Sequence, residues 1–308
     1  ITIGDPAGIG PEVTLKALMD ESVFDICNPI IIGDRNVIEE AVKVMKIPFE
    51  MKIYDILNVS SISNKNFKKG KASKEGGKAC VDYIKRAVEL ASLKIVKAVV
   101  TAPISKESLR MAGFSWPGHT EMLAEFTGTL NYAMLLYSDR IKVILVTTHA
   151  PLRDIPDLIT KERVYETILN AYRASKMLSI EKPRIAVCAL NPHAGEAGIF
   201  GKEEIEHIIP AVEKATSYGI PVTGPIPSDI LFWKAYHGEY DIVVCMYHDQ
   251  GLIPLKMLAF NKGVNITIGL PFIRTSPAHG TAYDIAWKGL ADPSSMIEAL
   301  KLAANLEI

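Results

Sequence analysis

The sequence contains only four cysteines, and no two of them are close enough to form a Cys-x-x-Cys pair. Cys188 and Cys245 lie within apolar stretches that read as strands, whereas Cys27 and Cys80 are far from both. This spacing provides neither a disulfide framework nor a thiol-based metal motif. We therefore expect buried, reduced thiols in a cytoplasmic protein.

Long hydrophobic runs and an excess of charge are also missing. Apolar runs such as Pro29–Gly33 and Val143–Val146 are far shorter than the roughly 20 residues that cross a bilayer. The formal net charge is −1, so no global field attracts the chain to nucleic acid or to an anionic membrane. Ile1–Ile3 already has a strand pattern without a secretion signal, and we expect native residues before it. We predict neither a membrane nor a nucleic-acid partner.

Short β-rich runs alternate with helical patterns along the chain. Segments 78–93 and 203–218 repeat apolar residues at spacings of three and four, which is typical of amphipathic helices. Their apolar faces contain Val81, Ile84, Val88 and Ala91 in the first, and Ile205, Ile208, Ile209 and Val212 in the second. The expected strands are 30–32, 51–54, 98–100, 141–147, 184–189, 242–246 and 264–268, and an exposed loop is expected at 60–74. This alternation predicts an α/β fold with largely parallel sheets covered by helices.

Three of the seven histidines occupy the same kind of position. His149, His193 and His248 each follow the carboxyl end of an expected strand, where α/β proteins place their ligand crevices. Three imidazoles can bind a divalent ion and leave a position open for a reactant, as at catalytic zinc sites. One such histidine alone would be an ordinary loop residue, but three together predict a metal site. Asp249 and Glu196 either orient these ligands or are solvated loop carboxylates.

A second group of polar residues suits an anion. His119 and Thr120 stand directly before a helical run at 122–126, where exposed amides, an imidazole and a hydroxyl can bind a negative group. Thr120 can equally be the N-cap of that helix, a contact worth about 1 kcal/mol.

Further along the chain, Lys256, Asn265 and Arg274 each read as a surface group, but together they are a candidate clamp for a phosphate and a carboxylate. The opening turn Gly4–Glu12 is rich in glycine and places Pro11 in a first helical turn. It does not match the G-x-G-x-x-G fingerprint, so binding of NAD would not use the ordinary Rossmann turn.

Nine motifs, in this order along nearly the whole chain, resemble those of the 4-hydroxythreonine-4-phosphate dehydrogenase (PdxA) family. They are GDPAGIGPE (4–12), TAPISK (101–106), GHTE (118–121), TTHAPLRD (147–154), LNPHAGE (190–196), GPIPSD (224–229), MYHDQG (246–251), GVNITIGLPFIRTS (263–276) and HGTAYDIA (279–286). Motifs of this length are specific for the family and less so for the substrate, because a similar branch oxidises threonate or erythronate 4-phosphates.

The resemblance implies a fold like that of isocitrate and isopropylmalate dehydrogenases, with two α/β/α domains and an active-site cleft between them. It assigns 1–125 together with 265–308 to a discontinuous cofactor-side domain. It assigns 126–264 to a metal-binding and dimerisation domain.

The resemblance also implies a homodimer with shared active sites, in which His149, His193 and His248 bind one divalent ion. Zinc is expected first, with cobalt or magnesium as alternatives, since histidine ligands suit zinc-like ions and magnesium prefers oxygen. The matching substrate positions are His119, Thr120, Lys256, Asn265 and Arg274.

The implied reaction is NAD-dependent oxidation of 4-phosphooxy-L-threonine (4-hydroxythreonine 4-phosphate) at C3, then decarboxylation to 3-amino-2-oxopropyl phosphate in pyridoxal phosphate biosynthesis. Lys256, Asp229 and a metal-bound water are candidates for the proton acceptor. A loop with His279, Gly280 and Asp284 would hold the adenosine part of the cofactor. A carboxylate at Asp284 favours NAD over NADP, because it repels a ribose 2′-phosphate.

Three other functions stay open: a dehydrogenase of D-threonate or D-erythronate 4-phosphate, a metal-dependent hydrolase or phosphatase, and a silent metal-binding protein. A hydrolase would need no NAD, which leaves the loop at His279 without a role. The chain also departs from the family pattern twice, with Ile230 in place of threonine and Trp287 in place of glycine. The first change removes a hydroxyl from the region expected near C2 of the substrate.

Overall fold

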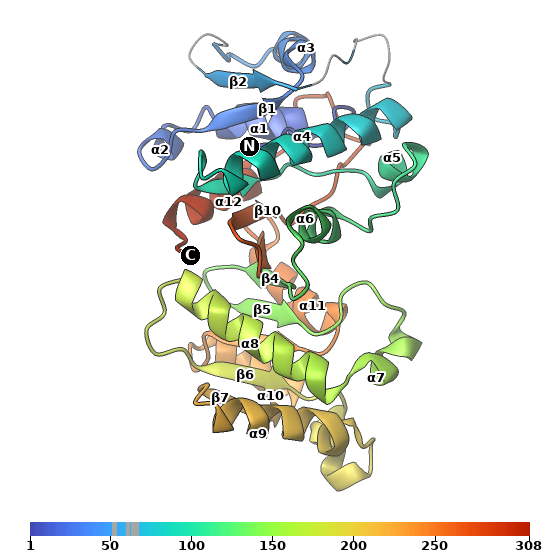
Figure 1. Cartoon of the computed structure of the whole chain (residues 1–308), viewed down its shortest axis with the longest axis vertical. Coiled ribbons are helices and arrows are strands. Elements are labelled where there is room, and N and C mark those ends of the chain that lie inside the picture. The colour runs from blue at the N-terminus through green and yellow to red at the C-terminus, as the bar shows by residue number, and fades with distance from the viewer. Residues whose placement is uncertain (51–53, 60–61, 63–67) are drawn as a thin grey trace. The chain divides into compact units, whose positions relative to one another are not determined.

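The computed structural model describes residues 1–50, 54–59, 62 and 68–308, which divide into two compact units (Figure 1). Unit 1 consists of Ile1–Leu130 and Leu270–Asn305, and unit 2 consists of Asn131–Gly269 and Leu306–Ile308. The functional roles expected for the two domains stay predictions. In the described part of the chain, no helix is both long and apolar enough to cross a membrane.

Unit 1 combines short parallel strand pairs with helices. Strand β1 (Ile30–Gly33) pairs with β2 (Asp55–Asn58), and β3 (Ala98–Val100) pairs with β10 (Ile273–Pro277). Thr2 forms parallel bridges to both Ile32 and Thr101, and so links the two pairs. The helices are α1 (Gly10–Ala17), α2 (Glu21–Phe24), α3 (Arg35–Met45), α4 (Lys74–Ser92), α5 (Lys106–Met111), α6 (His119–Thr127) and α12 (Ser294–Asn305).

Helix α4 confirms the helix expected at 78–93 and begins four residues earlier. Ser73 is its N-cap, because the Ser73 side chain accepts a hydrogen bond of 3.0 Å from the Gly76 amide. The four apolar residues of the expected face are all buried. The predicted helical turn at Pro11 is also confirmed, since α1 begins at Gly10.

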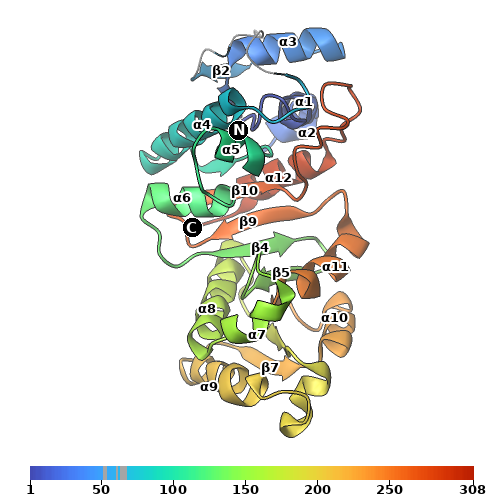
Figure 2. The ribbon, with the colours of Figure 1, turned by 90° about the vertical axis from the view of Figure 1, so that its right-hand side faces the viewer.

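Unit 2 contains a mixed sheet with the strand order β9-β4-β5-β8-β6-β7. Strand β4 runs antiparallel to both of its neighbours, whereas β5, β8, β6 and β7 are parallel to one another. Figure 2 shows α8 and α9 on one face of this sheet and α10 and α11 on the other. The strands are β4 (Ala133–Tyr137), β5 (Lys142–Leu145), β6 (Ile185–Cys188), β7 (Val222–Ile226), β8 (Ile242–Cys245) and β9 (Val264–Ile268).

The helical elements of unit 2 include short turns as well as α-helices. Their bounds are η1 (Leu152–Asp154), α7 (Ile155–Leu158), α8 (Lys161–Met177), η2 (Pro192–Gly198), η3 (Glu204–Ile208), α9 (Ile209–Ser217), α10 (Ser228–Tyr236) and α11 (His248–Ala259). The single helix expected at 203–218 is therefore wrong in detail: η3 is a π-helical turn that precedes α9. The π-turn changes the register of side chains, and Ile205 is exposed instead of buried.

Three strands were not expected from the sequence. Strand β7 contains Gly224 and Pro225, and β10 contains Arg274 among hydroxyl side chains, so neither has an apolar strand pattern. The third, β4, is apolar but was overlooked. Of the expected strand 51–54, residues 51–53 lie outside the described residues, and β2 begins after Tyr54. Of the expected loop 60–74, residues 62 and 68–73 are described and belong to no helix or strand, and Lys74 is the first residue of α4.

The cysteines are free thiols, as expected. Cys80, Cys188 and Cys245 are buried, and Cys27 is partly buried. Burial raises the pKa of Cys80 and Cys245 well above the ordinary thiol value, which keeps both thiols protonated and unreactive.

Candidate active site

The topology of unit 2 brings the ends of three parallel strands to one edge of the sheet. Strands β5, β8 and β6 are neighbours and run in the same direction. His149 follows β5, His248 opens α11 directly after β8, and His193 follows β6. The prediction that each histidine lies beyond the carboxyl end of a strand is therefore confirmed.

Two of these histidines lie side by side. The ring centroids of His149 and His248 are 5.8 Å apart. Two imidazoles on one tetrahedral ion place their ring centroids about 5 Å apart. His248 Nδ1 lies 2.7 Å from Asp249 Oδ1, so this contact leaves Nε2 as the ring nitrogen available to an ion. The donor chemistry of this pair fits a divalent ion.

His193 is held in an unusual backbone conformation. Residues 193–198 have consecutive positive φ values between 43° and 95°, and only two of the six are glycines. A left-handed conformation costs roughly 1–2 kcal/mol for each residue with a side chain. Such strain persists only where neighbouring groups hold it, and it is concentrated at functional sites.

Glu204 is the neighbouring group that holds the strand end before this turn. Its side chain is 1% exposed, and Oε1 accepts hydrogen bonds from the amides of Leu190 (2.8 Å) and Asn191 (2.7 Å). Oε2 accepts a third from Asn191 Nδ2 at 3.0 Å. A Cβ on Gly195 would lie 2.7 Å from Glu204 Oε2, so the turn also packs directly on this carboxylate. Sequence reasoning missed Glu204, because it read as one more polar residue of a surface helix.

The three histidines His149, His193 and His248 do not come together within a single chain. Within the described residues, no group of three His, Cys, Asp or Glu side chains is close enough to hold one metal ion. His149 and His248 are brought together, and His193 is not brought to them. His149 and His193 are both exposed, so their rings are accessible to a further ligand or to another chain.

Arg274 is the largest fully buried side chain of unit 1. It lies on β10, is 1% exposed, and donates from Nη2 to Thr101 Oγ1 at 2.7 Å. Burial lowers its pKa to about 9, opposed by the negative charge of Glu121, so the guanidinium is still charged at neutral pH. The interpretation of Arg274 as a surface group is therefore wrong, because its side chain is fully buried.

His119 lies close enough to Arg274 to respond to its charge. Burial, and then repulsion by Arg274, hold the pKa of His119 well below its usual value. The ring is therefore neutral at pH 7, and its buried Nε2 has no hydrogen-bond partner among the described residues. A buried cation beside an imidazole nitrogen that lacks a partner suits an anionic ligand.

The remaining predicted substrate residues differ in exposure. Helix α6 begins at His119 with Gly118 as N-cap and no side-chain cap, so the alternative that Thr120 caps it is wrong. Asn265 lies on β9, and its buried Oδ1 has no partner among the described residues. Lys256 is exposed on α11, and Asp229 is exposed on α10, where its Oδ1 accepts from the Ile230 amide at 2.9 Å.

Residues 278–291, which we call the cofactor loop, pack on the opening turn of the chain. The Ile9 amide donates to Thr281 O at 3.0 Å, and a Cβ on Gly8 would touch the Thr281 side chain at 3.0 Å. Trp287 is 7% exposed and donates from Nε1 to Pro6 O at 3.0 Å. The opening turn is thus a platform for the loop.

The predicted cofactor residues occupy the first part of this loop. His279 Nε2 is buried with no hydrogen-bond partner among the described residues, while Nδ1 is 3.1 Å from Gly280 O. Burial lowers the pKa of His279 below its usual value. Asp284 is exposed, and residues 283–289 form turns.

Comparison with known proteins identifies the family of this chain. The family profile described as "Pyridoxal phosphate biosynthetic protein PdxA" matches residues 25–303. The chain belongs to the PdxA family. A 4-hydroxythreonine-4-phosphate dehydrogenase of Desulforapulum autotrophicum is 45% identical over 99% of this chain and 94% of its own length. A D-threonate 4-phosphate dehydrogenase of Salmonella typhimurium is also 45% identical, over 99% of this chain and 98% of its own length.

Solved structures give the same assignment for the fold. A crystal structure of 4-hydroxythreonine-4-phosphate dehydrogenase from Klebsiella pneumoniae has a TM-score of 0.89 and 41% identity, covering 98% of this PdxA-family chain and 97% of its own. An isocitrate dehydrogenase from Methylococcus capsulatus, 14% identical with a TM-score of 0.51 over 97% of this chain and 82% of its own, shares the fold. The protein is an α/β dehydrogenase, and its family implies a nicotinamide cofactor.

Proposed function

We propose that this PdxA-family chain oxidises 4-phosphooxy-L-threonine at C3 with NAD and then releases carbon dioxide, giving 3-amino-2-oxopropyl phosphate. The hydride of C3 passes to NAD and the hydroxyl proton to a base. The bond between C1 and C2 then breaks, and C2 takes up a proton. Because the C3 ketone is β to the carboxylate, the electron pair of the broken bond is delocalised onto the ketone oxygen. The relatives named for this substrate support the assignment.

The observation that carries the proposal is the buried cation of Arg274 beside the neutral ring of His119. A phosphate or carboxylate there would accept charge-assisted hydrogen bonds and offset the cost of burying the guanidinium. A bound anion would also raise the pKa of His119, so its second nitrogen could become a donor. In this proposal His119, Thr120, Asn265, Lys256 and Arg274 hold the substrate by its charged ends.

We propose that the metal site is completed by a second copy of the chain. One chain supplies the adjacent pair His149 and His248, and the partner would supply the equivalent of His193. Helix α11, which begins at His248, and its C-cap residue support this proposal with three exposed apolar side chains at spacings of four and three. These side chains are Ile253 (57% exposed), Met257 (82%) and Phe260 (77%). Apolar surface of this kind marks an interface in soluble proteins.

The three histidines would hold one divalent ion, with zinc favoured by the imidazole donors. When bound, such an ion lowers the pKa of an alcohol and stabilises negative charge on oxygen during decarboxylation. The residues of the chain orient the substrate and accept the C3 hydroxyl proton, for which Lys256 and Asp229 are the exposed candidates.

The cofactor loop is the proposed site for the adenosine part of NAD. The buried Nε2 of His279 supports this role, because it requires a partner from a ligand or from water. Asp284 is exposed at the loop surface, where its carboxylate would accept from a ribose hydroxyl and repel a 2′-phosphate. NAD is therefore the proposed cofactor, in preference to NADP.

A second candidate substrate is D-threonate 4-phosphate or D-erythronate 4-phosphate, because relatives named for D-threonate 4-phosphate are equally similar. The substrates differ at C2, which carries an amino group in 4-phosphooxy-L-threonine and a hydroxyl group in the two sugar-acid phosphates.

Purified protein incubated with NAD, a divalent ion and 4-phosphooxy-L-threonine should form NADH and carbon dioxide in equal amounts without free phosphate. Release of phosphate without NADH would instead indicate a hydrolase.

A further inference from the structure

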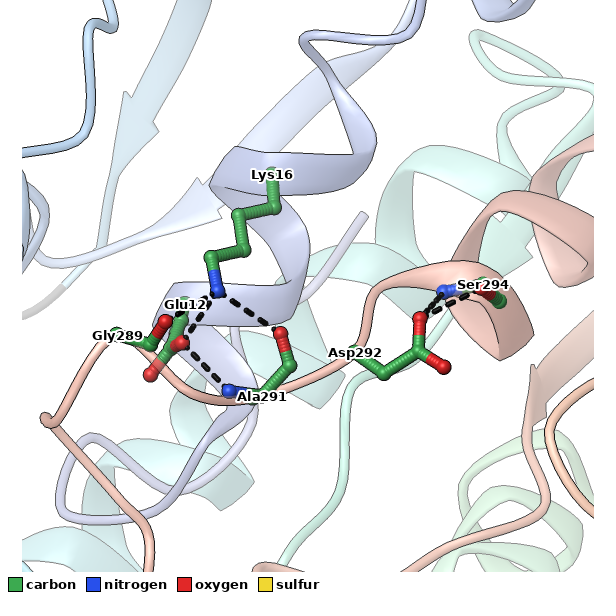
Figure 3. Close-up of polar contacts among 6 residues, drawn as sticks. All are labelled: Glu12, Lys16, Gly289, Ala291, Asp292 and Ser294. Atoms are coloured by element: carbon green, nitrogen blue, oxygen red, sulfur yellow. Dashed lines mark hydrogen bonds and ion pairs between the residues drawn. The ribbon is translucent and has the colours of Figure 1, made fainter.

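Lys16, on α1, uses all of its hydrogen-bonding capacity on one small group of oxygen atoms. Figure 3 shows its ammonium group between Glu12 and the end of the cofactor loop. Nζ donates to Glu12 Oε1 at 2.8 Å, to Gly289 O at 2.8 Å and to Ala291 O at 2.9 Å. An ammonium has three donors and no acceptor, so this set satisfies it completely.

Glu12 is the counter-ion of this group and is itself buried. Its side chain is 1% exposed, and Oε1 accepts a further hydrogen bond of 2.8 Å from the Ala291 amide. A carboxylate at this depth is costly unless a cation accompanies it. Lys16 and Glu12 together bind both the amide and the carbonyl of Ala291, and so fix the backbone of the loop end (Figure 3).

Asp292 follows directly after the cofactor loop. Its carboxylate interacts electrostatically with Lys16 at this end of the loop and with His279 at the other. Ser294 binds the Asp292 carboxylate from its amide at 2.9 Å and from its hydroxyl (Figure 3). These bonds lower the pKa of Asp292, with smaller electrostatic contributions from His279 and Lys16. Asp292 therefore lies within electrostatic range of both Lys16 and His279, the first proposed cofactor residue.

We propose that Lys16 is a built-in cation that holds the cofactor loop in its NAD-binding conformation, with Glu12 as counter-ion. A free monovalent cation can bind at a group of three oxygen atoms such as this one. Here the cation is the ammonium group of Lys16, which is covalently part of the chain. Lys16 is thus a positioning residue that acts through the loop. This inference rests on the proposed function, because it requires the loop to bind NAD.

The test uses Lys16→Ala, which removes the ammonium and opens space for a soluble amine, and Lys16→Met, which keeps the aliphatic chain. Titration of NADH fluorescence should give about 10-fold weaker binding or more in both variants, the loss expected for about 1.4 kcal/mol. Added propylammonium should restore binding in Lys16→Ala and leave Lys16→Met unchanged. Lys97→Met is the matched control, because Lys97 donates to a single exposed carbonyl, Ala304 O, outside the loop.

Hydrogen exchange of the 278–291 amides separates this inference from the function on which it rests. In the wild-type protein, NADH should protect these amides, and absence of protection there would overturn the proposed cofactor site. Protection in the wild type combined with unchanged NADH affinity in both Lys16 variants would overturn the positioning role alone. Weaker binding that no amine restores, with faster exchange throughout unit 1, would also overturn it, because Lys16 would then be a general stabilising residue.

Discussion

At the scale of single residues, the site is defined by charges that burial has made costly. Arg274 is buried beside His119, whose neutral ring has a nitrogen without a partner in the described part of the chain. Burying a cation and a polar nitrogen lowers stability, and a protein can retain such groups where a bound ligand interacts with them. Function and stability are often in conflict at active sites for this reason. Both residues are therefore better tested by ligand binding than by stability alone.

Arg274→Met should abolish most substrate recognition while the protein stays folded. Loss of one partner of a buried charge pair costs about 2–5 kcal/mol, so kcat/KM should fall by about 30-fold or more. The melting temperature should change by only a few degrees, because the variant also removes a desolvated charge. Arg86→Met, at an exposed ion pair with Glu89, is the matched control. Unchanged kcat/KM in Arg274→Met would remove the central support for the anion site.

His119 should make the stability of the protein sensitive to acid. Its folded-state pKa lies well below the unfolded value of about 6.5, so the unfolded chain binds the extra proton first. The free energy of unfolding should therefore decrease as the pH falls below about 6.5, by at most about 1.4 kcal/mol per pH unit. Urea titrations of wild type and His119→Gln should diverge below this pH and run parallel above it. Parallel curves at every pH would show that His119 is not buried in neutral form.

The residue types of the site could be predicted from the sequence, but their environments could not. His149, His193 and His248 were found because each follows a strand, which is a local pattern. The burial of Arg274 depends on long-range packing of β10 against β3, which no local pattern reports. Glu12 and Lys16 were missed for the same reason, since their partners Gly289 and Ala291 are more than 270 positions away in sequence.

At the scale of elements, the parallel strands determine where the histidines lie, and the turn at 193–198 determines how one of them is presented. The strands β5, β6 and β8 were predictable from their apolar runs. The left-handed turn was not, because its residues His193, Ala194, Glu196 and Ala197 give no signal for positive φ values. The turn is specified by a contact instead, namely that of Gly195 with the buried carboxylate of Glu204.

Glu204→Ala should loosen this turn and weaken metal binding. The change leaves the backbone amides of Leu190 and Asn191 without their acceptor, whereas Asn191 Nδ2 keeps its second acceptor, Glu203 Oε2. We expect a loss of about 2–4 kcal/mol in the free energy of unfolding. Glu204→Gln keeps an acceptor oxygen and should cost less. Calorimetric titration with zinc should show at least about 10-fold weaker binding in the alanine variant, as for other groups that support metal ligands. Equal zinc affinity in all three proteins would contradict a role for the turn in metal binding.

At the scale of the whole molecule, the proposed dimer would combine two incomplete metal sites. Because His149 and His248 are adjacent in one chain, the variant that complements them must be His193→Ala. Mixing inactive His193→Ala with inactive His149→Ala should restore up to about one site per heterodimer once subunits exchange. Mixing His149→Ala with His248→Ala should restore nothing, and serves as the control. Failure of the first mixture after demonstrated exchange would contradict shared sites.

The whole-molecule fold was the part of the account most accessible from sequence, because alternating strands and helices identify an α/β protein before any tertiary contact is known. The mixed direction of the sheet was not accessible, since β4 was overlooked and strand direction depends on its pairing with β5 and β9.

The central claim is the identity of the substrate, and parallel steady-state assays with NAD test it most directly. We predict that kcat/KM for 4-phosphooxy-L-threonine exceeds that for D-threonate 4-phosphate by about 10-fold or more, a difference that one charged hydrogen bond at C2 can supply. The product of the first reaction should be 3-amino-2-oxopropyl phosphate, formed together with NADH. An equal or higher kcat/KM for D-threonate 4-phosphate would contradict the account and assign the chain to the second candidate reaction.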